Sequence, residues 1–346
     1  MMEKGYMMRF DVNKICFLGM YSALLRKYSV NVSEEELLVG CKKITFEYHY
    51  VYENKKNDDE WKKSDYCYLI GTTDTVEDIN EVFGGLTVVN FDDASLYTNY
   101  IINMAAVGIP VLVYIDVFYL PYHPQYQNMH ASTMIMVYGL EKDQLLIYDG
   151  YVTTIPQTYF CGLVPADIID KALWKEKHID SGKGFGVTIY EKQDRNNVVN
   201  YRSSIFENAQ SMLSQNNANV GTIGIKNLAI NIQEWIEEWN DNKIKDNMRR
   251  IYHSITSRGG PAISRNVYAE FLYKNLDFLS ESERNDICKE LFDCAKKWNG
   301  IAVKAFRCSL SLNAKYIVQI SKELQTISCI EHEIWGKLTR ILKIRK

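Results

Sequence analysis

HASTMIMVYGLEKDQLLIYDG, residues 130–150, is the stretch of the chain that decides its fold. Two runs of apolar, β-branched and aromatic residues, Thr133 to Leu140 and Leu145 to Tyr148, flank a short polar segment, which is the pattern of a β-hairpin. His130 comes just before the first strand, and Asp149 directly follows the second. This arrangement lets the carboxylate orient the imidazole ring.

A cysteine at the start of a helix completes this group. From Cys16 onward, apolar side chains recur at the spacing of one helix face, at Leu18, Tyr21, Leu25 and Tyr28. A helix N-terminus and a nearby imidazolium both stabilise a thiolate, which makes the sulfur a strong nucleophile. We therefore predict a Cys-His-Asp site in which Cys16 attacks, His130 moves the proton and Asp149 orients His130.

Two assignments in this site have alternatives. His123 lies seven residues before His130 in the same loop and is the alternative base, although two prolines and the lack of a following strand leave its placement less defined. Asn13, three residues before Cys16, is a candidate oxyanion-hole donor beside the Cys16 backbone N–H. A turn or cap role for Asn13 is equally compatible with the sequence.

Three residues on the strand and loop that precede His130 are candidates for substrate binding. Asp116 lies near the end of a hydrophobic strand predicted at Pro110 to Phe118, just ahead of the loop, and either binds a substrate amine or caps the end of that strand. Tyr119 and Tyr122 lie in the loop that comes next and are the other two candidates.

The change of pattern along the chain predicts two domains. At 346 residues the chain is long for one compact core, and its first half mixes strands and turns, whereas its second half is nearly all helical in pattern. We therefore expect an α+β fold with domains at residues 1–195 and 196–346 and a linker at Arg195 to Asn197. In the second domain we expect helices near residues 203–215, 222–239, 243–256, 264–279, 281–298 and 301–343, the last of them interrupted.

Charge, cysteine spacing and hydropathy argue against several classes of protein. A net charge of -3 with scattered Lys and Arg argues against a nucleic-acid partner. The eight cysteines form no CxxC pair, and the sequence has no phosphate loop or dinucleotide fingerprint, so we expect no metal and no cofactor of the protein's own. Polar residues and Pro110 interrupt the longest apolar region, Tyr100 to Tyr122, so we expect no membrane span and a cytoplasmic protein.

The sequence resembles the butirosin biosynthesis protein H type family of acyltransferases over nearly its whole length. In the first half the resemblance is carried by Cys16 and its helix, Ser33-Glu34-Glu35, Pro110-Val111-Leu112-Val113, Asp116, Tyr119-Leu120-Pro121-Tyr122, His130, Val137-Tyr138-Gly139 and Asp149. In the second half it is carried by Arg258-Gly259-Gly260, Arg265, Tyr268, Phe271-Leu272 and Trp298. The glycine-rich, aromatic stretch of the family appears here as GCKKITFEY, residues 40–48, with the loss of its later glycines.

The resemblance implies a papain-like, peptidase C39-like catalytic domain followed by an all-helical domain. It implies transfer of an acyl group from the phosphopantetheine thioester of an acyl carrier protein, through Cys16, to a small-molecule amine. The phosphopantetheine arm would be the sole cofactor. The family context is antibiotic or nonribosomal-peptide-like biosynthesis, with an aminoacyl or β-aminoacyl unit as the candidate acyl group.

Two other functions stay open at this point. The triad does not specify whether water or an amine resolves the acyl-enzyme, so a cysteine peptidase or amidase of the same fold is the first alternative. A noncatalytic carrier-binding or ligand-binding protein, in which Cys16 is dispensable, is the second. The oligomeric state is also open between a monomer and a homodimer.

Overall fold

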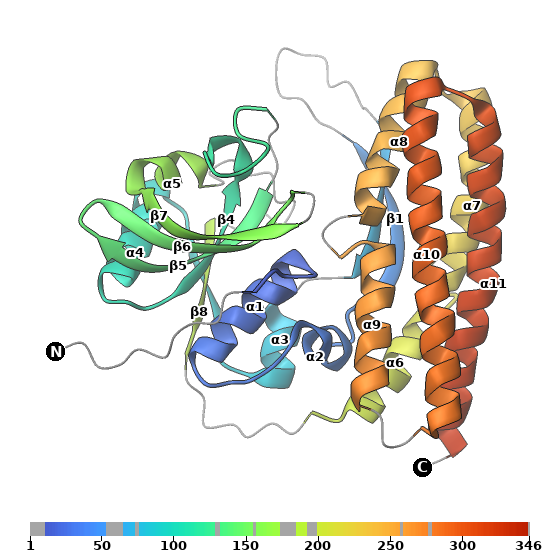
Figure 1. Cartoon of the computed structure of the whole chain (residues 1–346), viewed down its shortest axis with the longest axis horizontal. Coiled ribbons are helices and arrows are strands. Elements are labelled where there is room, and N and C mark those ends of the chain that lie inside the picture. The colour runs from blue at the N-terminus through green and yellow to red at the C-terminus, as the bar shows by residue number, and fades with distance from the viewer. Residues whose placement is uncertain are drawn as a thin grey trace. The chain divides into compact units, whose positions relative to one another are not determined.

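The computed structural model describes residues 11–52, 65–72, 76–128, 132–154, 157–173, 185–191, 199–256, 259–275 and 279–344. The chain forms two compact units (Figure 1). The first unit consists of Met1–Leu37 and Asp74–Val199, and the second consists of Leu38–Thr73 and Asn200–Lys346. The first unit contains a large β-sheet and the second is mainly helical, which confirms the predicted α+β class. The papain-like fold stays a prediction.

The two units differ from the predicted division at residues 195 and 196. The antiparallel strands β1 (Ile44–Tyr52) and β2 (Asp65–Thr72) lie in the first half of the sequence but belong to the second unit. The second unit is therefore built from two separate segments of the chain. The predicted linker at Arg195 to Asn197 lies outside the described residues.

Aromatic packing explains why the β1–β2 hairpin belongs to the second unit. Phe46 stacks on Trp298, with 5.4 Å between the ring centroids, and both side chains are fully buried. Asn231 Nδ2 donates a hydrogen bond of 3.0 Å to the Tyr48 hydroxyl. These contacts join residues that are far apart in the sequence, and strand propensity alone does not show on which core a strand packs.

A six-stranded antiparallel sheet with the order β3-β8-β4-β5-β6-β7 lies at the centre of the first unit. Its strands are β3 (Leu86–Phe91), β4 (Val111–Asp116), β5 (Ser132–Glu141), β6 (Gln144–Val152), β7 (Thr158–Pro165) and β8 (Phe185–Tyr190). The helices of this part of the chain are α1 (Cys16–Lys27), α2 (Glu34–Gly40), α3 (Val76–Phe83), α4 (Ala94–Ala106), the 3-10 helix η1 (Val117–Tyr119) and α5 (Ala166–Ala172).

Both faces of the central strands are covered, which explains their nearly continuous apolar runs. On one face, Val113, Ile135 and Ile147 pack in a cluster with residues of α4 and α5. Met134 and Met136 alternate with Ile135, so they point to the opposite face, and they are also buried. No α1 residue belongs to the cluster, whereas α1 contacts β4, β5 and β6. We therefore place α1 on the opposite face of the sheet.

The predicted hairpin at residues 130–150 is confirmed over its described part. Strands β5 and β6 pair in antiparallel register, with Met136 opposite Tyr148 and Glu141 opposite Gln144. On the other side of β5, Ser132 lies opposite Asp116 at the end of β4. This register brings the end of β4, the start of β5 and the end of β6 to one end of the sheet.

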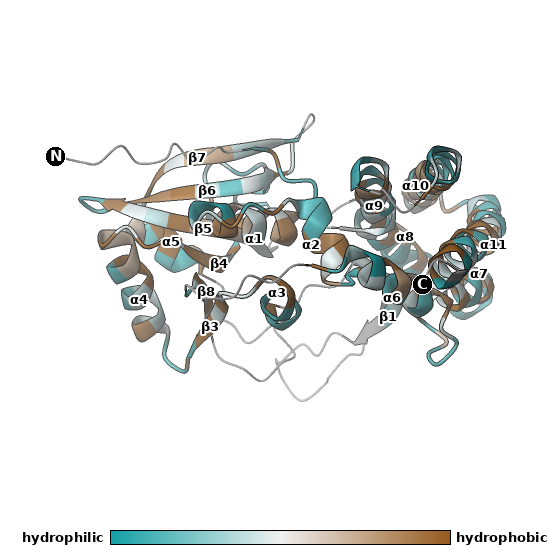
Figure 2. Ribbon diagram, turned by 90° about the horizontal axis from the view of Figure 1, so that it is seen from below, coloured by the Kyte–Doolittle hydropathy of each residue, from teal (hydrophilic) through white to brown (hydrophobic). Residues whose placement is uncertain are grey.

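The second unit contains six helices among its described residues, and the predicted helices agree with most of them. They are α6 (Tyr201–Leu213), α7 (Gly221–Glu238), α8 (Asp241–Thr256), α9 (Pro261–Asn275), α10 (Glu281–Ser311) and α11 (Ala314–Ile344). Figure 2 shows hydrophilic and hydrophobic colours on different sides of these helices, as expected where one face is buried. In the described part of the chain, no helix combines the length and the hydropathy that a membrane span requires.

The predicted helix end at residue 298 is wrong. Helix α10 continues through Gly300 to Ser311 without a break. A single glycine inside a long amphipathic helix is tolerated when the surrounding packing is good, and Trp298 and Ile301 on either side of Gly300 are buried. The turn between α10 and α11 instead falls at Leu312, whose φ of 52° is in the left-handed region.

A buried ion pair joins helices and hairpin within the second unit. Arg265 of α9 donates two hydrogen bonds to Glu331 of α11, Nε to Oε1 at 3.0 Å and Nη2 to Oε2 at 2.8 Å, and both side chains are fully buried. Arg265 Nη1 also donates to the carbonyl oxygen of Thr45 in β1, at 2.6 Å, and Trp298 Nε1 donates to Glu331 Oε1 at 3.0 Å. Both charges are therefore satisfied by several partners, as a buried pair requires.

We expect Glu331→Gln to destabilise the second unit by about 3–5 kcal/mol, because the variant leaves the buried Arg265 guanidinium without a counter-charge. Urea unfolding followed by tryptophan fluorescence measures this loss, since Trp298 and Trp335 both donate hydrogen bonds to Glu331. The matched control is Asp293→Asn, which removes an ion pair with Lys296 whose side chains are 47% and 78% exposed. It should change the stability by less than about 1 kcal/mol. Equal effects of the two variants would contradict this account.

Candidate active site

Cys16 is the first residue of α1, as predicted, and lies against the start of β5. Ile15 is the N-cap residue of the helix, in an extended conformation, and its apolar side chain makes no capping hydrogen bond. The Cys16 Sγ atom lies 3.5 Å from Thr133 Oγ1, and the residue is 5% exposed. Because the positive end of the helix dipole lies at this position, a thiolate on Cys16 would be stabilised there.

Asn13 ties the segment before α1 to the end of β6. Its backbone N–H donates to the carbonyl oxygen of Gly150 at 2.7 Å, and its side-chain oxygen accepts a hydrogen bond of 3.2 Å from the Tyr148 hydroxyl. Gln157 Nε2 donates to the Asn13 carbonyl oxygen at 2.8 Å. Asn13 is 2% exposed, so this network is sheltered from water.

Two glycines leave room for the Asn13 side chain. A Cβ atom at Gly19 would lie 2.1 Å from Asn13 Cγ, and a Cβ atom at Gly150 would lie 2.2 Å from Asn13 Nδ2. The amide Nδ2 points toward the first turn of α1, where it is 3.5 Å from the Cys16 carbonyl oxygen. Asn13 therefore lies beside Cys16, and its role as an oxyanion donor stays a prediction.

Asp149 is fully buried, and both of its carboxylate oxygens accept hydrogen bonds. The Tyr151 backbone N–H donates to Oδ1 at 3.0 Å, and the Tyr122 hydroxyl donates to Oδ2 at 3.2 Å. Burial raises the pKa of Asp149 to about 6, and the hydrogen bonds from Tyr151 and Tyr122 oppose this rise. The carboxylate is thus held in one orientation within β6, three residues before the strand ends at Val152.

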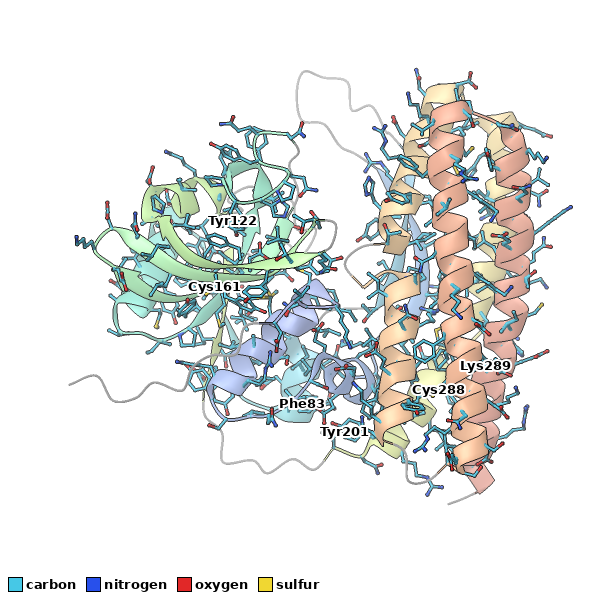
Figure 3. The ribbon with its side chains drawn as sticks, in the orientation of Figure 1. Phe83, Tyr122, Cys161, Tyr201, Cys288 and Lys289 are labelled. Atoms are coloured by element: carbon cyan, nitrogen blue, oxygen red, sulfur yellow. The ribbon has the colours of Figure 1, made fainter. Side chains whose placement is uncertain are left out.

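Tyr122, predicted as a substrate-binding candidate, is partly buried and its hydroxyl contacts Asp149. Its ring stacks on Phe160 of β7, with 3.9 Å between centroids and planes 4° apart, beside the sheet of the first unit (Figure 3). Burial and the negative charge of Asp149 both raise the pKa of Tyr122 well above its usual value. Tyr122 therefore remains a neutral hydrogen-bond donor to the carboxylate.

The remaining predicted residues differ in how the structure places them. His130 lies outside the described residues. His123, the alternative base, is 5% exposed, and its Nδ1 accepts a hydrogen bond of 3.2 Å from the Gln125 backbone N–H within its own loop. Asp116, the last residue of β4, accepts a hydrogen bond of 3.0 Å from the Phe118 backbone N–H, so it caps η1 rather than the strand end. Tyr119 is 37% exposed.

Two residues that contribute to the site were not predicted from the sequence. Thr133 supplies the hydroxyl nearest to the Cys16 sulfur, and Tyr148 supplies the hydroxyl that holds Asn13. Two features of the sequence could have pointed to them. Thr133 is a polar residue at the start of an apolar strand, and Tyr148 directly precedes Asp149. Neither feature indicates a contact with the Cys16 segment, which is more than a hundred residues away in the sequence.

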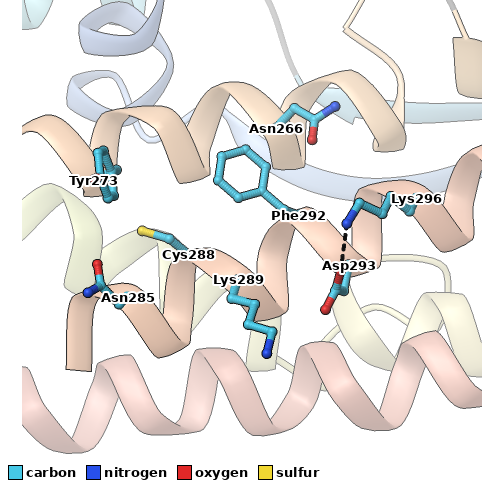
Figure 4. A pocket seen from close by; sticks show the side chains of 8 residues that line it. All are labelled: Asn266, Tyr273, Asn285, Cys288, Lys289, Phe292, Asp293 and Lys296. Atoms are coloured by element: carbon cyan, nitrogen blue, oxygen red, sulfur yellow. Dashed lines mark hydrogen bonds and ion pairs between the residues drawn. The ribbon is translucent and has the colours of Figure 1, made fainter. Parts of the chain in front are cut away.

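The groove between α9 and α10 contains none of the predicted site residues. It has a volume of about 540 Å³, and Tyr273, Cys288, Phe292 and Lys296 are among the residues that line it (Figure 4). It belongs to the second unit, so we do not assign it to the Cys16 chemistry. Among the described residues, no cluster of three or more His, Cys, Asp and Glu side chains has the arrangement of a metal site.

Two family models match the chain. Residues 16–150 match the family described as Butirosin biosynthesis protein H, N-terminal, which confirms the resemblance inferred from the motifs. Residues 184–338 match a Domain of unknown function (DUF4872). The first match begins at Cys16 and ends just after Asp149, so it includes the described site residues except Asn13, Ile15, Tyr151, Gln157 and Phe160. A search of curated proteins found no significant match.

We expect Asp149→Asn to stabilise the protein at pH 8 but not at pH 4. Because burial raises the pKa of Asp149 from its usual 3.8 to about 6, its carboxyl group favours the folded state below pH 4, and this contribution is lost as the pH rises through 6. An uncharged Asn avoids the loss, so the gain at pH 8 should reach about 2–3 kcal/mol.

Urea unfolding of the first unit at both pH values measures the effect of Asp149→Asn. The matched control is Asp143→Asn in the exposed turn between β5 and β6, which should change little at either pH. A gain that does not depend on pH would contradict the assignment of the raised pKa to Asp149.

Proposed function

Residues 16–150 belong to the butirosin biosynthesis protein H, N-terminal family, and from this premise we propose that the chain is a biosynthetic transferase that forms an amide bond. Cys16 accepts an acyl group from the phosphopantetheine thioester of an acyl carrier protein. A small-molecule amine then takes the acyl group from Cys16. The phosphopantetheine arm of the donor is the sole cofactor in this proposal.

The observation that carries the proposal is the position of Cys16 at the start of a buried helix, beside the sheet end that holds Asp149. Asn13 links the Cys16 segment to Gly150, the residue after Asp149. The nucleophile and the acid thus come from segments that are far apart in the sequence but joined by a backbone hydrogen bond of 2.7 Å. A helix that begins at the nucleophile and packs on an antiparallel sheet also supports a papain-like arrangement.

The proposed reaction has two steps, and His130 carries the proton in each of them. In the first step Cys16 gives its proton to His130 and its sulfur attacks the thioester carbonyl. The carbon–sulfur bond to phosphopantetheine breaks, and the released thiolate takes that proton from His130. One thioester replaces another, so the change in bond energy is small. In the second step the amine attacks the acyl-Cys16 carbonyl and loses a proton to His130. The carbon–sulfur bond to Cys16 breaks as the amide forms, and His130 returns the proton to the Cys16 thiolate.

The surroundings of Cys16 favour transfer over hydrolysis. The cysteine is 5% exposed and Asp149 is fully buried, so little bulk water reaches the acyl group. Asp149, held by Tyr122 and Tyr151, would orient His130 and stabilise the imidazolium that forms in each step. The Cys16 backbone N–H and Asn13 Nδ2 are the proposed donors to the oxyanion.

The family description supports a place in secondary metabolism. We propose that the donor carries an aminoacyl or β-aminoacyl unit and that the product is an antibiotic or a nonribosomal-peptide-like compound. The partners are then an acyl carrier protein and an amine acceptor, and the reaction takes place in the cytoplasm. A homodimer is compatible with this scheme.

We expect intact-mass spectrometry to show one acyl adduct on the wild-type chain after incubation with a carrier protein that carries an aminoacyl thioester. Cys16→Ala should show no adduct, because it lacks the accepting sulfur. The matched control is Cys41→Ala, which removes a cysteine with the same 5% exposure and should form the adduct as the wild type does. Addition of an amine should then remove the adduct and produce the amide.

Other outcomes of this experiment would point to other functions. Two outcomes would overturn the transfer reaction. One is an acyl adduct on Cys16→Ala, and the other is a wild-type chain that forms neither the adduct nor the amide. Hydrolysis of a peptide without a carrier protein would favour a peptidase or amidase. Alkylation of Cys16 at the same rate as Cys41, unaffected by His130→Ala, would favour a noncatalytic binding protein.

A further inference from the structure

The backbone that leads into α1 is held by a carboxylate from the next helix. Glu34 is the first residue of α2, and its Oε2 accepts hydrogen bonds from the Ile15 N–H at 2.7 Å and from the Lys14 N–H at 3.0 Å. Its Oε1 is 3.1 Å from the same Lys14 nitrogen. Both bonded amides belong to the two residues that directly precede Cys16.

This contact holds the chain just before α1, whose own N-cap residue makes no side-chain hydrogen bond. An N-cap residue usually has a short polar side chain that binds the first amides of its own helix, but Ile15 has none. Glu34 binds the amides of Ile15 and the residue before it and none within the helix, so it fixes the direction in which the chain enters α1. The first residue of that helix is Cys16.

Glu34 lies at the start of α2, which a reciprocal pair of neighbouring residues holds. Ser33 and Glu36 form a reciprocal pair at the start of α2, with the Ser33 N–H donating to Glu36 Oε2 at 2.8 Å and the Glu36 N–H donating to Ser33 Oγ at 3.2 Å. The Lys14 ammonium group also donates to Glu35 Oε1 at 2.8 Å. The entry to α1 and the start of α2 therefore form one connected unit.

We propose that Glu34 is a positioning residue for Cys16, which it keeps in its reactive place by binding the Lys14 and Ile15 amides. The inference rests on the proposed function and adds to it a residue that acts through Cys16 without touching the substrate. The distance from Cys16 to Thr133 and the attachment of Asn13 to β6 both depend on how this segment enters the helix. A shift of about 1 Å in a reacting group can lower a rate about a hundredfold.

The ionisation of Glu34 indicates which substitution should keep its positioning role. Burial raises the pKa of Glu34 to about 7, with Lys14, Glu35 and Tyr148 as its titratable neighbours. Near neutral pH the side chain is therefore only partly ionised, and its oxygens serve mainly as acceptors for the two amides. A glutamine keeps one such oxygen without the charge, whereas an alanine keeps none.

The test compares Glu34→Ala and Glu34→Gln with the control Glu35→Ala. The control removes the contact with Lys14 Nζ but leaves the hydrogen bonds from the Lys14 and Ile15 amides to Glu34. Iodoacetamide labelling resolved by peptide mass spectrometry gives the alkylation rates of Cys16 and Cys41 in the same molecule. We expect Glu34→Ala to slow labelling of Cys16 by at least about tenfold while Cys41 keeps its rate. Glu34→Gln and Glu35→Ala should stay within about threefold of the wild type.

Three results would overturn the inference. These are an unchanged Cys16 rate in Glu34→Ala, a parallel change at Cys41 that indicates general unfolding, and a Glu34→Gln rate as low as that of Glu34→Ala. Because labelling needs no carrier protein and no amine, it can support the role of Glu34 even if acyl transfer fails. The converse result is that the wild type transfers the acyl group while Glu34→Ala forms the acyl adduct on Cys16 at the same rate. That result would overturn the inference and leave the proposed function intact.

Discussion

The Asp149 carboxylate is fully buried, so the protein has to supply the hydrogen bonds that water would otherwise make. Tyr122 and Tyr151 supply them, and the ring of Tyr122 is in turn fixed by Phe160. The loop between β4 and β5 must therefore fold back over the end of the sheet. Gly150, the neighbour of Asp149, also binds Asn13, so the same sheet end fixes the approach to α1. The rest of the site depends on satisfying this one buried charge.

Local patterns predicted much of the fold and part of the site. Apolar periodicity located α1 and its start at Cys16, alternation and turn residues located the β5–β6 hairpin, and the helices of the second unit followed from their apolar stripes. Asp149 was predicted to follow this strand, but β6 continues through Gly150 to Val152, so Asp149 lies within it. Each of these features is decided by residues within about ten positions of one another in the chain.

Features that depend on distant contacts were not predicted. The β1–β2 hairpin packs on Trp298 because of aromatic contacts that no local pattern encodes, and α10 continues through Gly300 because its neighbours are buried. Asp116 had two roles compatible with the sequence, and only its hydrogen bond to Phe118 shows that it caps η1. The positions of Thr133 and Tyr148 near the Cys16 segment likewise depend on the register of the whole sheet.

The second unit is discontinuous in the sequence, and this has a consequence for synthesis on the ribosome. Residues Leu38–Thr73 emerge early, but the helices they pack against begin at Asn200, after residues 74–199 have been made. Until then Phe46 and Tyr48, both buried in the finished protein, have no core to enter. The nascent chain therefore exposes an aromatic hairpin until α10 is complete.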